Sequence, residues 1–137
     1  MVQVIHIAGS LPEVYNIIGP YAMDAEVIRK RKNLPIVTKE SYVWHVLMEG
    51  KKVKAFVAME SGEHYNKLQS FVVLEANKNE LRELLKDVLE HFERTNKTEL
   101  TASVLKEFVN LFEKQKFEVL KVKTNWTDLV YTAYEKI

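Results

Sequence analysis

Apolar and polar residues follow two repeating patterns along almost the whole chain. Alternation over a few residues indicates a half-buried strand, whereas apolar residues spaced three and four apart indicate an amphipathic helix. The clearest helical face is formed by six apolar residues: Leu81, Leu84, Leu85, Val88, Leu89 and Phe92. Asn77 and Glu80 have the spacing of a capping box, in which two residues satisfy each other's backbone N–H groups. Together these features predict a helix over 77–95.

The remaining pattern predicts strands and shorter helices. Strands are expected over 2–8, over both halves of a hairpin at 42–60, and over 67–76, 98–102, 117–123 and 128–137. Further helices are expected over 11–18, 21–33 and 103–116. At the start of the first of these, Ser10 and Glu13 again have the spacing of a capping box.

The order of these elements predicts the fold class. Hairpins come first and last, and a strand–helix–strand unit lies between them, which is expected to be parallel and right-handed. We therefore predict an α+β fold, with an α/β mixed sheet of six or seven strands flanked by helices. The chain of 137 residues contains no repeat, low-complexity tract or linker, so 1–137 is expected to form a single domain.

Composition excludes several classes of protein. The net charge of +1 gives no general attraction to nucleic acid or to an anionic membrane. Cysteine is absent, which excludes disulfides, thiolate metal ligands and a cysteine nucleophile. The N-terminus does not have the pattern of a signal peptide, and no apolar run approaches the roughly 20 residues that a membrane span needs. We expect a cytoplasmic protein with no membrane partner.

The most specific local signal is the stretch NLFEKQKFEV, residues 110–119, where a predicted helix meets a strand. Helices often end at a glycine in the left-handed conformation, but that place here holds Lys116 or Gln115. The stretch resembles the Leu-Tyr-Glu-Lys-x-Gly-Phe segment of the GCN5-related N-acetyltransferase family. The positions that match in place or in kind are Leu111, Phe112, Glu113, Lys114 and Phe117. The order of elements resembles that family over essentially the whole chain.

This resemblance implies an acyl-CoA N-acyltransferase-like fold, with acetyl-CoA as the cofactor and an amine as the acceptor. In the family, a glycine-containing turn after the fourth strand holds the coenzyme A pyrophosphate on backbone N–H groups, aided by the helix dipole. The corresponding turn here reads EANKNEL and contains no glycine. The family's usual acid, a tyrosine, falls on Phe112, which has no proton to give. The positions implied for cofactor binding are Val73, Leu74, Asn77, Lys78, Asn79 and Phe112.

Acyl transfer to an amine also needs a base and an acid. Glu75, at the end of a predicted strand, is a candidate base; the alternative is a solvated carboxylate. Ser103 is a candidate proton donor; the alternative is that it caps the following helix. Tyr131 or Tyr134 could replace the missing tyrosine, although both also suit packing positions on the last strand.

The histidines give no signal of a metal site. His6 and His45 lie in predicted strands and are interpreted as structural, and His64 lies in a polar turn and is expected to be exposed. No two histidines have the spacing of metal ligands, so we expect no metal.

Three functions remain open. The first is an N-acyltransferase-like protein that transfers an acetyl group from acetyl-CoA to an amine. The second is a catalytically inactive scaffold of the same fold that binds a protein partner or another ligand. The third and weakest is nucleic-acid binding through the basic run RKRK at 29–32, which is otherwise a solvated helix end. The resemblance implies that this region borders the acceptor site. Family members with this sheet often pair, so a homodimer is an alternative to a monomer.

Overall fold

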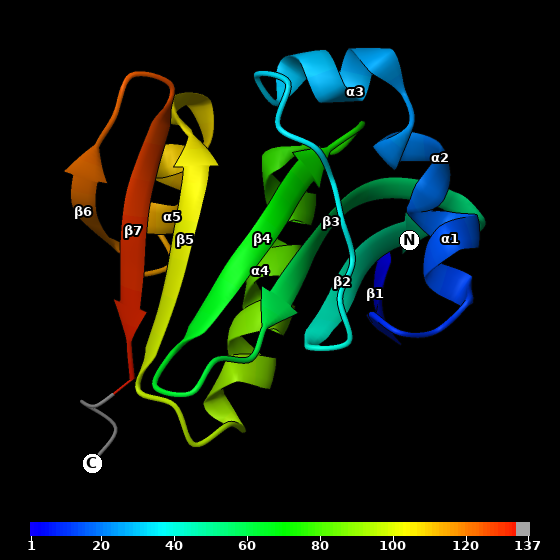
Figure 1. The fold of residues 1–137 in the computed structure, drawn as a ribbon. Coiled ribbons are helices and arrows are strands. Elements are labelled where there is room, and N and C mark those ends of the chain that lie inside the picture. The colour runs from blue at the N-terminus through cyan, green and yellow to red at the C-terminus, as the bar shows by residue number, and fades with distance from the viewer. Residues whose placement is uncertain (134–137) are drawn as a thin grey trace.

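A computed structural model describes residues 1–133, which fold around one seven-stranded mixed sheet (Figure 1). The strands are β1 (Gln3–Ala8), β2 (Tyr42–Glu49), β3 (Lys52–Glu60), β4 (Asn66–Val73), β5 (Glu99–Leu105), β6 (Glu118–Val122) and β7 (Trp126–Thr132). Their order across the sheet is β1-β2-β3-β4-β5-β7-β6. β4 and β5 are the parallel pair, and the other neighbours are antiparallel. The predicted fold class is therefore confirmed.

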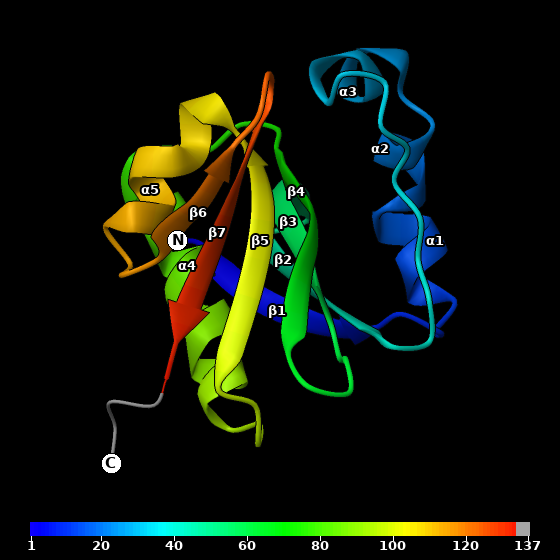
Figure 2. The ribbon, with the colours of Figure 1, turned by 60° about the vertical axis from the view of Figure 1, so that its left-hand side comes forward.

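Helices cover both faces of the sheet (Figure 2). They are α1 (Glu13–Ile17), α2 (Gly19–Ala22), α3 (Ala25–Lys30), α4 (Lys78–Glu93), the 3₁₀ turn η1 (Lys106–Phe108) and α5 (Val109–Glu113). α4 and α5 pack on one face, where Leu84, Leu85 and Phe92 are fully buried, and α1 to α3 lie on the other. In the described part of the chain, every helix is too short or too polar to cross a membrane.

The predicted capping box of α4 is present. The Glu80 N–H donates to Asn77 Oδ1 at 2.9 Å, and the Asn77 N–H donates to Glu80 Oε1 at 3.1 Å. The capping box predicted for Ser10 and Glu13 is wrong. The chain turns earlier, with the Leu11 N–H bonded to the Ala8 carbonyl, so α1 begins only after Pro12 and has no side-chain cap.

The predicted boundary between the fifth strand and the last helix is also wrong. β5 extends through Leu105, because 103–105 pair with 126–128 of β7. Ser103 is therefore a strand residue and not a helix cap, and the helical region begins at η1. The tertiary pairing overrides the helical spacing of the apolar residues here. The last strand was predicted over 128–137; β7 ends at Thr132, and 134–137, including Tyr134, lie outside the described residues.

Lys116 adopts the left-handed conformation that a glycine usually provides at the end of a helix. Its φ is +72°, in the left-handed region that glycine adopts most easily. The N–H of Phe117 reaches back to the carbonyl of Phe112 at 3.2 Å, as in a Schellman motif. The rings of Phe112 and Phe117 also pack edge to face, with centroids 5.1 Å apart. The helix end therefore keeps the glycine geometry with a lysine in place.

Candidate functional site

The parallel strands β4 and β5 separate along their length (Figure 1). They pair at three positions near their N-terminal ends, from Asn66↔Leu100 to Leu68↔Ala102. Beyond these pairs β4 continues to Val73 and β5 to Leu105 without pairing to each other. The carboxyl ends of the two strands therefore enclose a gap in the sheet, which is where open sheets tend to bind ligands.

A bulge in β4 accompanies this separation. Ala58 of β3 pairs with Gln69, and Phe56 pairs with Val72, so β4 has one residue more than β3 over this stretch. Ser70 lies within the bulge and has a φ of +55°. A bulge bends its strand and changes the direction of the following side chains. This one lies just where β4 leaves β5.

The gap opens into a cavity of about 470 Å³, which we call the gap cavity. It is lined by 71–74 at the end of β4, by Leu105 and Phe108, and by parts of α3 and the basic run 29–32. Val73 and Leu74, both predicted to contact a cofactor, line this cavity.

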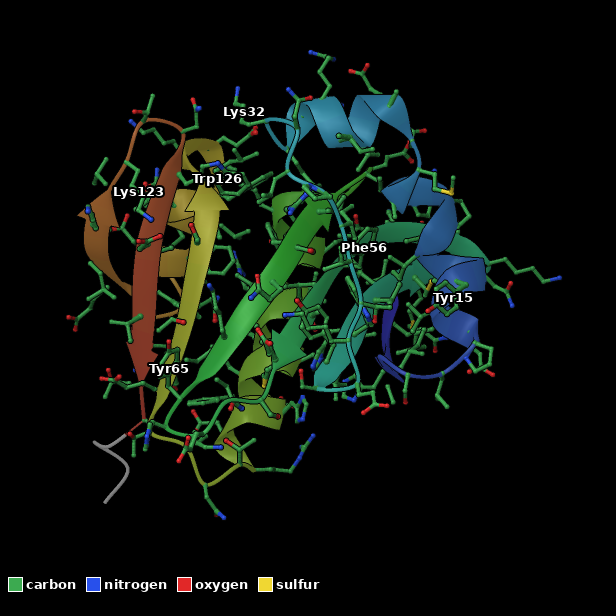
Figure 3. The ribbon with its side chains drawn as sticks, viewed as in Figure 1. Tyr15, Lys32, Phe56, Tyr65, Lys123 and Trp126 are labelled. Atoms are coloured by element: carbon green, nitrogen blue, oxygen red, sulfur yellow. The ribbon has the colours of Figure 1, made fainter. Side chains whose placement is uncertain are left out.

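The basic run is only partly a solvated helix end. Arg29 forms an ion pair with Glu26, whereas Arg31 is buried. The Arg31 guanidinium lies 5.9 Å from the centre of the Trp126 ring, which connects the α3 region to β7. Figure 3 shows Lys32 and Trp126 at the same end of the sheet. The basic run therefore borders the gap cavity from the side opposite α4.

A second cavity, of about 190 Å³, lies between the first turn of α4 and α5, and we call it the helix cavity. Phe108 and Glu107 line both cavities, so the two adjoin. Three cationic residues line the helix cavity, Lys78, Arg82 and Lys114, beside the apolar side chains of Leu81 and Leu111. This combination suits a ligand that has both anionic and apolar parts.

The turn before α4 has little negative charge to repel an anion. The Lys54 ammonium lies 2.9 Å from Glu80 Oε2 and 3.2 Å from Glu49 Oε1, with only 10% of the lysine side chain exposed. The hydrogen bond from Lys54 and that from the Asn77 N–H hold the pKa of Glu80 below its usual value. Glu75 is neutralised in turn by Lys52. Both carboxylates of the turn thus have a cationic partner.

Few backbone N–H groups of this turn are left for a ligand. Those of Leu74 and Glu75 both donate to the Lys54 carbonyl, at 2.9 and 3.1 Å. The Asn77 N–H is used in the capping box. The N–H groups of Lys78 and Asn79 belong to the first turn of α4, where a helix provides no backbone acceptor. Within this turn, these two are the N–H groups best placed for an anion.

The structure does not bring the two predicted catalytic residues together. Glu75 is paired with Lys52, which lowers its pKa, its side chain is 69% exposed, and it lines neither cavity. Ser103 lies across the gap on β5, beside Asp128, in a separate hollow with Ser70 and Trp126. Their catalytic roles stay predictions.

Phe112, at the place of the family's tyrosine, and Tyr131, a candidate to replace it, also lie away from the cavities. Phe112 is fully buried against Phe71 and Phe117 and therefore touches neither cavity. Tyr131 packs on Phe92, and its hydroxyl donates to Glu93 at 2.5 Å. Phe108 is the aromatic residue that lines both cavities; sequence reasoning missed it, because no local motif marks this position.

Comparison with known proteins gives a fold and no close relative. No family model and no curated protein matches the sequence. A probable acetyltransferase from Staphylococcus epidermidis superposes with a TM-score of 0.71 at 14% identity, over 97% of this chain and 99% of that one. A GNAT family acetyltransferase from Elizabethkingia anophelis, solved with acetyl-CoA bound, gives 0.67 at 12% identity, over 96% and 98%. A domain from Methanocaldococcus jannaschii gives 0.71 at 13% identity, over 97% and 100%. The chain therefore has the fold of the GCN5-related N-acetyltransferases.

Proposed function

We propose that the protein is an acyl-CoA-dependent N-acyltransferase that transfers an acetyl group from acetyl-CoA to an amine. The observation that carries this proposal is the gap between β4 and β5, which joins a cation-lined cavity at the N-terminus of α4. The fold neighbour with acetyl-CoA bound supports the same ligand class. A cytoplasmic location is part of the proposal.

The cofactor would lie across both cavities. Its anionic phosphates would meet Lys78, Arg82 and Lys114 and the N–H groups of Lys78 and Asn79, because charge-assisted hydrogen bonds are the strongest available. Its uncharged arm, which carries the thioester, would run past Phe108 toward Val73 and Leu74. When bound, acetyl-CoA supplies the activated thioester.

The amine would enter the gap cavity from the α3 side. Glu107 lines both cavities, and we assign it the role of base that takes the proton from the attacking amine. The basic run on the opposite wall favours an acceptor that carries a negative charge elsewhere in its structure. Ser103 remains the predicted proton donor on the other side of the gap.

Thermal unfolding with acetyl-CoA, desulfo-coenzyme A and ATP tests binding. A ligand at about 100 times its dissociation constant adds roughly 2.7 kcal/mol of stability, enough to raise the midpoint by several degrees. We expect a shift with both coenzyme A forms and none with ATP. Arg82→Ala and Lys114→Ala should each weaken binding by about tenfold or more, since a hydrogen bond to a charged group contributes about 1.5–3 kcal/mol. Lys121→Ala, an exposed lysine on β6, is the control and should bind normally.

Turnover measurements distinguish Glu107, the proposed base, from Glu75, the base predicted from the sequence. Release of free thiol from acetyl-CoA is measured with a panel of amines. Glu107→Gln should reduce the rate by about 10²-fold or more, whereas Glu75→Gln should not. A larger loss of rate in Glu75→Gln than in Glu107→Gln would mean that Glu75 is the base. No midpoint shift with millimolar coenzyme A would overturn the proposal altogether.

A second candidate function is a scaffold of this fold that binds a ligand without catalysis. The burial of Phe112 at the place of the family's tyrosine favours it, because no hydroxyl is available there. Tight coenzyme A binding without thiol release for any amine would favour this second function.

A further inference from the structure

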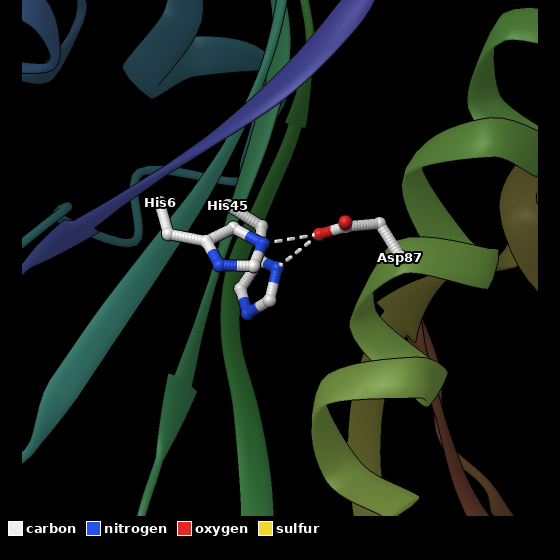
Figure 4. Close-up of side chains that lie close together, drawn as sticks. All are labelled: His6, His45 and Asp87. Carbon is white, nitrogen blue, oxygen red and sulfur yellow. Dashed lines mark hydrogen bonds and ion pairs between the residues drawn. The ribbon is translucent and has the colours of Figure 1, made fainter. Parts of the chain in front are cut away.

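Polar side chains from three elements meet between the sheet and α4, away from both cavities (Figure 4). His6 and His45 are directly opposite each other on β1 and β2, so their side chains share one face of the sheet. Asp87 and His91 are one turn apart on α4 and therefore share one face of that helix. The packing of α4 on the two strands brings these side chains together.

The contacts converge on a single carboxylate oxygen. His6 Nε2 lies 2.6 Å and His45 Nδ1 lies 2.8 Å from Asp87 Oδ2. The other nitrogen of His45, Nε2, lies 2.9 Å from His91 Nδ1. Figure 4 shows both imidazole rings directed at the same oxygen. One ligand atom from each of His6, His45 and Asp87 thus lies within 4.8 Å of the others.

The donor set suits a divalent transition metal. Zinc binds imidazole nitrogen and carboxylate oxygen at about 2.0–2.2 Å, so its tetrahedral ligand atoms lie roughly 3.3 Å apart. Small side-chain rotations would open the present contacts to that spacing. Two histidines and one carboxylate leave a fourth position for water, and the His6 side chain, 38% exposed, provides a solvent-facing side.

The surroundings of His45 also suit a metal ligand. His45 is fully buried, and its two ring nitrogens lie against Asp87 Oδ2 and His91 Nδ1. On metal binding through Nδ1, His45 would carry its proton on Nε2 and donate it to His91 Nδ1. Such a second-shell hydrogen bond fixes the tautomer of a metal-bound histidine.

A solvent route leads to the cluster. Asp87 lines an open hollow of about 240 Å³ between β1 and α4. Glu83 and Glu90 line the same hollow, together with Lys86. Carboxylates at the mouth of a site raise the local concentration of cations.

We propose that His6, His45 and Asp87 bind one divalent transition metal ion, with His91 as the second-shell partner of His45. The ion ties the edge strand β1 to α4. Spacing along the sequence predicted no metal because the ligands lie on three separate elements. The site is independent of the proposed coenzyme A site.

Titration of the metal-free protein with Zn²⁺ in a calorimeter tests the proposal, with Co²⁺ as a spectroscopic probe. We expect one ion per chain, a raised unfolding midpoint and the visible absorption of tetrahedral Co²⁺. His6→Gln, at the most exposed ligand, should abolish binding while preserving the circular dichroism spectrum. His91→Phe should weaken binding by about 10–100-fold, as second-shell changes do. His64→Gln removes an exposed histidine outside the cluster and should bind as the wild type does.

Three results would overturn the assignment. The first is no binding at millimolar Zn²⁺. The second is binding that survives in His6→Gln, and the third is binding lost in His64→Gln. Either of the last two would mean that other residues hold the ion.

Discussion

Replacing Lys116 by glycine should stabilise the protein. Lys116 adopts a φ of +72° at the end of α5, where the Phe117 N–H bonds to the Phe112 carbonyl. An L-residue with a side chain pays a steric penalty in this conformation because its Cβ crowds the backbone. The Lys116 side chain is exposed, so removing it costs little packing.

The size of the effect follows from two opposing terms. Left-handed backbone costs a residue with a Cβ about 1–2 kcal/mol, which glycine avoids. Glycine also gives the unfolded chain more freedom, which costs about 0.5–1 kcal/mol of stability. The difference between the midpoints of these two ranges gives a net stabilisation of about 0.75 kcal/mol for Lys116→Gly. In a domain of this length, that corresponds to a rise of roughly 2–4 °C in the unfolding midpoint.

Urea and thermal unfolding of matched variants measure this effect. Lys114→Gly is the control, because Lys114 lies two residues earlier in the same segment and has an ordinary helical φ of −66°. The Lys114→Gly variant should lose about 0.5–1 kcal/mol of folding stability, since only the cost of the freer unfolded chain applies to it. If Lys116→Gly is no more stable than the wild type, or if both glycines have the same effect, the left-handed assignment at Lys116 is wrong.

Three further substitutions test the polar network and the core around the candidate site. Lys54→Ala leaves Glu80 without its cation and leaves Glu49 with the N-terminal ammonium alone, so it should lower the midpoint of urea unfolding; an unchanged midpoint would mean that the network contributes nothing. The lowered pKa of Glu80 means that the unfolded state binds its proton first, so this contribution is present above the unfolded pKa of 4.5 and is lost as the pH falls through the folded value. Glu80→Gln should therefore flatten the acid side of the stability profile, and an identical profile would contradict the assignment. Phe112→Tyr buries a hydroxyl in a fully packed position and should cost about 1–3 kcal/mol without raising turnover; faster thiol release would show that position 112 reaches the cofactor.

Local patterns predicted the fold well where one element carries its own signal. The six apolar residues of α4 and its capping box lie within a single segment, and both features are present in the structure. The β2–β3 hairpin was also predicted from local signal, because its alternating apolar residues and its turn at Gly50 are adjacent in the sequence. The boundary between β5 and η1 was missed because it depends on pairing with β7, more than twenty residues further along the chain.

The sites could be predicted only in part, for the same physical reason. Val73, Leu74 and Lys78 line the cavities, since their places follow from the position of one strand and one helix, and their role in cofactor binding stays a prediction. Lys114 and Phe108 reach the same place from α5 and η1, which a linear pattern does not reveal. The histidine cluster has even less local signal, because His6, His45 and His91 come from three elements far apart in the sequence.

Glycine is missing at two places, at Lys116 and in the turn over 74–80, and its absence has a different structural consequence at each. At Lys116 the backbone keeps the left-handed conformation, which glycine adopts without a steric penalty. The lysine adopts it under strain. In the turn over 74–80 the structure has no residue of positive φ, so the backbone there takes another path that needs no glycine. That path directs the N–H groups of Leu74 and Glu75 to the Lys54 carbonyl and away from a ligand. An anion at this turn would therefore depend on the side chains of Lys78, Arg82 and Lys114 more than on the backbone, so its binding should weaken as salt screens these exposed charges.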